Sequence, residues 1–172
     1  MVFSVADVAQ LFNVTNRTVR GWIERGWLPA VQIHPRLYAA TEWDLATFVL
    51  RRLEAYRAWV RGDVLGVRAP QKVWIARRGA WEIEATVHAK ITGAEAGLRP
   101  WKAETWYVLT WRVDNWRAQG RAKQAVPEGE TIRTKSPQKA RRWLAEHFAR
   151  LGSLELAGRA RKSQAWWPEH ET

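Results

Sequence analysis

The side chains best suited to chemistry lie together near the start of the chain, in the segment TNRTVR. Asparagine and arginine can form paired hydrogen bonds to the edges of bases, and threonine can contact the methyl group of thymine. The N-terminus of a helix also favours a phosphate group. This combination predicts a surface that reads nucleic acid, formed by Thr15, Asn16, Arg17, Thr18 and Arg20.

The residues around this segment predict two short helices joined by a tight turn. Ser4 is placed to cap the first helix and Asp7 to answer that cap, and apolar residues then recur at steps of three and four. Asn13 tolerates the left-handed conformation that a tight turn needs, Thr15 caps the second helix, and Gly26 ends it. The polar first turn of the second helix is then exposed and fits the major groove of DNA. The alternative is a small helical bundle with a solvated basic face.

The motifs VADVAQLFNVTNRTVRGWIERGWLPA and RLYAATEWDLATFV span about the first 50 residues, and they resemble the winged helix-turn-helix of the excisionase and MerR-type family. In that family a short hairpin wing follows the second helix. The resemblance implies that Arg36 and Tyr38 reach the DNA backbone or minor groove, and that a third helix starts at Thr41. The sequence departs from the family at Gly21, where a larger polar or aromatic residue is common, and at His34-Pro35, which stiffens the wing tip.

The third helix is expected to continue to Gly62, beyond its usual end in that family, because apolar residues keep helical spacing that far. Its first half should pack on the helix-turn-helix. The helix over 41–61 could form a homodimer, as in the MerR-type regulators, or its second half could be a spacer packed on the next part of the chain. The apolar seam is too short for a convincing coiled coil, so both alternatives stay open.

Composition and charge favour a polyanionic partner. The chain of 172 residues has a formal net charge of +11 and a pI near 10.8, and such an excess of positive charge is typical of proteins that bind nucleic acid. A basic surface without a partner is the alternative. No apolar stretch is long enough for a membrane span, and no signal-peptide pattern starts the chain. We therefore expect a cytoplasmic protein that does not bind membranes.

The sequence offers little for catalysis or metal binding. It contains no cysteine, which excludes disulfides, thiol nucleophiles and cysteine zinc sites, and its four histidines lack the spacing of metal ligands. No Ser-His-Asp set, P-loop or acidic metal cluster is visible. We expect no metal, no cofactor and no enzymatic activity.

A break in composition at residues 62–71 predicts a domain boundary. Alternating apolar and polar residues after it predict an antiparallel sheet, and aromatics on both faces of one strand are typical of a central strand. Ser136 is placed to cap a helix over 137–151, which Gly152 would end. The expected strands are 72–78, 81–91 with one wet face, 105–113 as the central strand, 116–126, and 131–135.

The stretches WYVLTWRVDN, GRAKQA and ETIRTKSPQKARRWLAEHF are similar to the three-stranded sheet and helix at the N-terminus of tyrosine-recombinase integrases, a module whose sheet enters the major groove. The strands over 72–91 are additional to that module, and the assignment fails if they cover the reading face. The basic strand 116–126 has the alternative role of a protected sheet edge. The resemblance implies nucleic-acid contacts by Arg112, Arg117, Arg121, Lys123 and Arg133.

Together these observations predict an α+β protein in three parts. A winged helix-turn-helix over 1–61 is followed by an antiparallel sheet with a C-terminal helix over 72–152 and by a basic, tryptophan-containing tail over 153–172. The expected function is sequence-specific binding of double-stranded DNA, as an excisionase or regulator of a mobile element or phage, with a recombinase or other protein as a further partner. The alternative is an adaptor in a larger nucleoprotein complex, such as terminase, replication or RNA-guided defence, which binds RNA or protein through its second domain.

Overall fold

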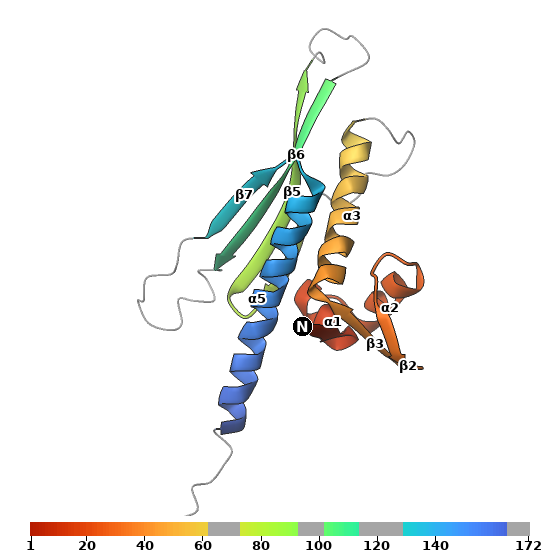
Figure 1. The fold of residues 1–172 in the computed structure, drawn as a ribbon, viewed down its shortest axis with the longest axis vertical. Helices are drawn as coiled ribbons and strands as arrows, with labels where there is room; N and C mark the ends of the chain where they lie inside the picture. Colours follow the sequence, from red (N-terminus) through yellow and green to blue (C-terminus); the bar gives the residue numbers. More distant parts are fainter. Residues whose placement is uncertain (62–72, 93–101, 114–128, 165–172) are drawn as a thin grey trace, which may run out of the picture.

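The computed structural model describes residues 1–61, 73–92, 102–113 and 129–164. Within them the chain forms four helices and two antiparallel sheets, one of three strands and one of four. This is the α+β fold expected from the sequence, with a C-terminal helix after the second sheet. The small sheet and the two short helices lie at one side of the molecule, and two long helices pack beside the larger sheet (Figure 1).

The first helix has the predicted start and end. Helix α1 (Val5–Phe12) begins after Ser4, whose hydroxyl accepts a hydrogen bond from the Asp7 amide at 3.1 Å. The Asp7 carboxylate accepts in return from the Ser4 amide at 2.9 Å, which completes a capping box. The helix ends at Asn13, whose φ of 53° lies in the left-handed region that the turn requires.

The second helix, α2 (Asn16–Glu24), follows the turn as predicted. Its cap is Thr15, whose hydroxyl accepts from the Thr18 amide at 3.2 Å. Val19 and Trp22 on its inner face are buried. Ile23 is half-buried beside them, and the first turn of the helix is exposed.

A three-stranded sheet of order β1-β3-β2 completes the N-terminal region. Strands β2 (Val31–His34) and β3 (Leu37–Thr41) form the expected hairpin wing. Strand β1 (Val2–Ser4) pairs antiparallel with β3, which sets Phe3 opposite Ala40, and both side chains are buried. The sequence did not predict β1, because a strand of three residues that ends at the helix cap is too short to show an alternating pattern.

The third helix, α3 (Glu42–Val60), is as long as predicted and begins with a capping box at Thr41. Its buried side chains include Phe48, Val49 and Leu53, whereas Trp43 and Trp59 are exposed. Near its end, Arg57 donates a hydrogen bond to the Thr105 hydroxyl of the larger sheet at 2.6 Å. The second half of α3 therefore packs on the larger sheet, as the spacer alternative expects.

The larger sheet has the order β4-β5-β6-β7, and all its pairs are antiparallel. Strand β6 lies inside the sheet, as its two aromatic faces predicted. The pair β4 and β5 extends the sheet at one edge and adds no layer to it, and the expected strand 116–126 lies outside the described residues. The four strands are β4 (Val73–Arg78), β5 (Trp81–Thr92), β6 (Lys102–Val113) and β7 (Glu130–Thr134).

The face of β5 that the sequence predicts to be wet is exposed at His88 and Lys90, but the prediction was wrong for Glu82 and Thr86. Glu82 is 3% exposed and Thr86 is 8% exposed. Arg77 and Arg112, on the strands at either side, both donate to the Glu82 carboxylate at 2.7 Å. Long arginine side chains from two neighbouring strands therefore screen this carboxylate from water.

The last helix, α5 (Pro137–Gln164), starts at the predicted cap, where the Ser136 hydroxyl accepts from the Lys139 amide at 3.3 Å. The predicted end at Leu151 was wrong, because the helix continues through Gly152. A Cβ on this glycine would collide with the Met1 side chain. The glycine therefore allows the N-terminus to approach the helix closely and does not stop it.

One aromatic cluster joins the N-terminal region to the larger sheet and α5. The Phe48 ring lies 5.7 Å from Phe12, 4.6 Å from Trp22 and 5.1 Å from Trp74 of β4. Phe148 of α5 lies 6.0 Å from Phe12. Buried residues of both halves thus form a single hydrophobic core, which fixes helix α2 relative to the sheet.

Candidate nucleic-acid interface

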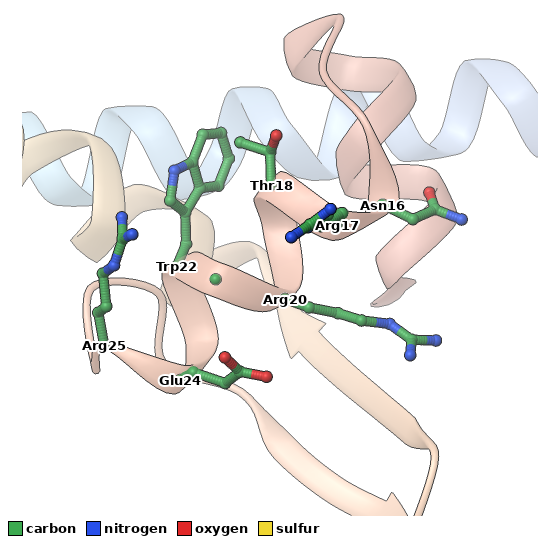
Figure 2. A pocket seen from close by; sticks show the side chains of 8 residues that line it. Asn16, Arg17, Thr18, Arg20, Trp22, Glu24 and Arg25 are labelled. Carbon is green, nitrogen blue, oxygen red and sulfur yellow. The ribbon is translucent and has the colours of Figure 1, made fainter.

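Helix α2 presents a hollow, polar face to solvent (Figure 2). Successive residues of a helix turn by about 100°, so Arg17 and Gly21 lie on the side opposite the buried Val19. The hollow has a volume of about 730 Å³. It is lined by Asn16, Arg17, Thr18, Arg20, Gly21, Trp22, Glu24 and Arg25.

Arg17 and Arg20 bring positive charge to this face without a counter-ion. Both are exposed, and neither forms an ion pair within the described residues. Glu24 lines the same hollow but is not paired with them. Guanidinium groups in this state can bind phosphate or the edge of guanine, because none of their donors is taken up by a carboxylate.

The two threonines of the predicted site serve the helix itself. The Thr15 hydroxyl accepts from the Thr18 amide, and the two hydroxyl oxygens lie 3.0 Å apart. The cap therefore fixes both side chains at the start of α2. Asn16 is exposed beside them, and the amides of the first turn have no acceptor within a helix. This end of α2 is suited to a phosphate or to base edges.

Three residues of the hollow were not predicted from the sequence as part of the site. They are Gly21, Glu24 and Arg25, and the hollow also includes the buried Trp22, which the sequence assigned to the core. A Cβ at position 21 would meet no atom within 4 Å, so packing does not require glycine there, and its lack of a side chain leaves space beside Arg17. The sequence does contain a signal for two of these residues. Gly21 and Arg25 follow Arg17 at four-residue steps, which places them on the same face of the helix.

The two wing residues lie in different surroundings. Arg36 is exposed in the turn between β2 and β3. Tyr38 is half-buried and lines a small internal space of the helix-turn-helix together with Val19 and Ile23. Arg36 is therefore open to solvent, whereas Tyr38 lines an internal space at the base of the wing.

The residues predicted on the larger sheet do not form a second free cationic surface. Arg112 donates to Glu82 at 2.7 Å and lies 2.9 Å from Glu84. Arg133 is exposed on the same face, opposite Val108 in the register. We call the face that carries Arg77, Glu82, Glu84, Arg112 and Arg133 the helix-free face, since α3 and α5 pack on the other side. The remaining predicted residues, Arg117, Arg121 and Lys123, lie outside the described residues.

A further polar cluster joins β7 to α5. His147 is 3% exposed and stacks on Trp143, with 3.7 Å between ring centroids. Its Nε2 atom lies 3.0 Å from the Glu130 carboxylate, and an Arg150 nitrogen lies 3.4 Å from the same oxygen. The hydrogen bond with His147, reinforced by the charge of Arg150, lowers the pKa of Glu130. This cluster holds strand and helix together and adds nothing to the hollow on α2.

Comparison of the chain with protein-family models, with curated proteins and with solved structures found no match. Within the described ranges, no group of three or more His, Asp or Glu side chains is arranged to hold a metal ion. None of the helices described above is long and apolar enough to cross a membrane. The geometry of α2 and the wing is therefore the basis for inferring a function.

Proposed function

We propose that this protein is a sequence-specific binder of double-stranded DNA, with a binding rather than a catalytic role. The observation that carries the proposal is the pair of exposed, uncompensated guanidinium groups of Arg17 and Arg20 on a rigidly capped helix. A helix of this size fits the major groove, where arginine can bind guanine through two hydrogen bonds.

In the proposed complex, helix α2 enters the major groove with its first turn. Arg17 and Arg20 read base edges there, and Asn16 can pair with adenine. Thr15 and Thr18 hold the turn in shape. Arg36 on the wing contacts the backbone or the adjacent minor groove and sets the register of the protein on the duplex.

The resemblance of the first 50 residues to excisionases and MerR-type regulators supports a role in recombination or transcription of a mobile element. A second candidate is an adaptor that binds a protein or RNA through the larger sheet. One observation favours it: the charges of Arg112 are compensated by Glu82 and Glu84, and a compensated polar face is better suited to a protein than to a duplex.

Selection of sites from a random duplex pool by the full chain tests the proposal. We expect a defined sequence to be enriched. Arg17→Ala or Arg20→Ala should reduce the base preference at one or two positions of that sequence, at about 1–3 kcal/mol for each lost base contact. Arg142→Ala removes an equal charge from an exposed position of α5 and should leave the enriched sequence unchanged. No enrichment by the parent, or equal enrichment by all variants, would contradict the proposal.

A further inference from the structure

The outer face of the wing is apolar and exposed. Val31 is 65% exposed, Ile33 63% and Leu37 49%. Val31 is opposite Ala39 in the register, so this face is the reverse of the one that carries Tyr38 and the buried Ala40. Single exposed apolar side chains are common on proteins, but three on one short hairpin form a patch that calls for a partner.

The tip of the hairpin is stiff. The register shifts between Gln32 and His34, so Ile33 is an extra residue with no partner opposite it, and such a bulge redirects side chains and strengthens the local twist. Pro35 restricts the turn through its fixed φ. The Pro35 carbonyl also accepts a hydrogen bond from the side-chain amide nitrogen of Gln32, Nε2, at 3.1 Å. Ile33 and Leu37 are therefore presented on a preorganised tip, with Arg36 between them in the chain.

The charge of the wing indicates what kind of partner fits this patch. Residues 31–39 include His34 and Arg36 and contain no acidic residue. Helix α2, which lies against the other face of the wing, carries the uncompensated Arg17 and Arg20. The apolar patch and the positive charge fit a partner with a polyanionic surface and apolar space between stacked groups. A DNA duplex has this combination, in its phosphates and its stacked bases.

We infer that the wing tip is a wedge, which inserts Ile33 or Leu37 into the minor groove of the bound duplex and partly unstacks one base step. The inference rests on the proposed function and extends it from reading DNA to deforming it. Apolar side chains of this kind kink duplexes by roughly 20–90° toward the major groove. Pyrimidine–purine steps unstack at the lowest cost, and we expect one of them beneath the wing.

The test uses the full chain and duplexes that contain the selected site, with 2-aminopurine placed at successive positions through the site and its flanks. This base fluoresces more strongly when it is unstacked. We expect one position to brighten on binding, and end-to-end energy transfer to report a bend of roughly 20–90°. The double variant Ile33→Ala, Leu37→Ala should lose most of both signals and still select the same sequence.

Two controls make the result specific. Both wedge side chains are exposed, so their removal should leave the thermal unfolding temperature nearly unchanged. Trp59→Ala removes an exposed apolar side chain from α3, far along the chain from the wing, and should retain full brightening and bending. A parent that selects a site without brightening any position, or a double variant that brightens and bends like the parent, would overturn the wedge and leave the proposed function standing. A parent that binds no duplex would remove both.

Discussion

Helix α2 and the helix-free face of the larger sheet both carry arginines, and both were predicted from the sequence as nucleic-acid contacts. The arginines differ in their surroundings. Arg17 and Arg20 are exposed and form no ion pair within the described residues. Arg112 instead lies against two carboxylates, those of Glu82 and Glu84. A count of basic residues therefore does not identify a polyanion site, because the positions of the carboxylates decide which charges remain available.

The register of the sheet explains this difference. Glu82 is opposite Arg77 on one neighbouring strand and opposite Arg112 on the other, so three charged side chains share one row across the sheet. Because Glu82 is nearly buried, its charge must be paired. The two arginines serve as its counter-ions. On α2, in contrast, the buried positions are apolar and need no counter-ion.

The largest expected effect tests whether the N-terminal region, which contains α2, and the larger sheet unfold together. Phe48 is fully buried between rings from α1, α2 and β4. We expect Phe48→Ala to lower the free energy of unfolding by about 3–5 kcal/mol, with helix and sheet signals lost in a single transition during denaturant unfolding. Gln138→Ala, at an exposed position in the first turn of α5, should change it by less than about 0.5 kcal/mol. Two separate transitions in the parent would show that the shared core does not couple the regions.

The second prediction sharpens the electrostatic contrast. The double variant Glu82→Gln, Glu84→Gln removes the negative charges that compensate Arg112, so the helix-free face should gain affinity for non-specific duplex DNA. Titrations at several salt concentrations should show tighter binding by about tenfold and a salt slope steeper by one to two units, at roughly 0.9 per added phosphate contact. Glu146→Gln, on the exposed side of α5, serves as the control for lost negative charge. An unchanged slope in the double variant would mean that carboxylates are not what keeps this face inactive.

The smallest effect concerns Glu130, an exposed carboxylate in contrast to the buried Glu82. Its pKa is lowered from an ordinary value of 4.5 by the hydrogen bond with His147 and the charge of Arg150. Because the folded-state pKa is the lower one, the contribution to stability is complete above the unfolded-state value and disappears as pH falls through the folded-state value. We expect the free energy of unfolding of the parent to exceed that of Glu130→Gln by ~0.2–1 kcal/mol near neutral pH. This difference should vanish at acid pH. Thermal unfolding of both proteins from neutral to acid pH tests this prediction. A stability difference that does not depend on pH would contradict it.

Features set by neighbouring residues were accessible from the sequence. The caps at Ser4, Thr15 and Ser136 depend on side chains within three residues of the helix start, and all three are present as predicted. The exposed face of α2 follows from the same local periodicity. The end of α1 at Asn13 is equally local, because one left-handed residue makes the turn.

Features set by distant residues were not accessible. Strand β1 forms because Phe3 pairs with Ala40 of the wing. The residues next to Phe3 in the sequence do not indicate this pairing. Helix α5 continues through Gly152, and the close approach of Met1 to this glycine is a contact between residues at opposite ends of the described chain. The compensation of Arg112 required the strand register, which alternation alone does not provide.

One measurement tests most directly the claim that α2, and not the sheet, carries the DNA interface. It compares titrations of one selected duplex with the parent and with two double variants of equal charge, Arg17→Ala with Arg20→Ala and Arg112→Ala with Arg133→Ala. We expect the first to weaken binding by about 100-fold, as for two lost base contacts, and the second to change it by less than about threefold. Equal losses in both variants, or a larger loss in the sheet variant, would contradict the assignment of the interface to α2.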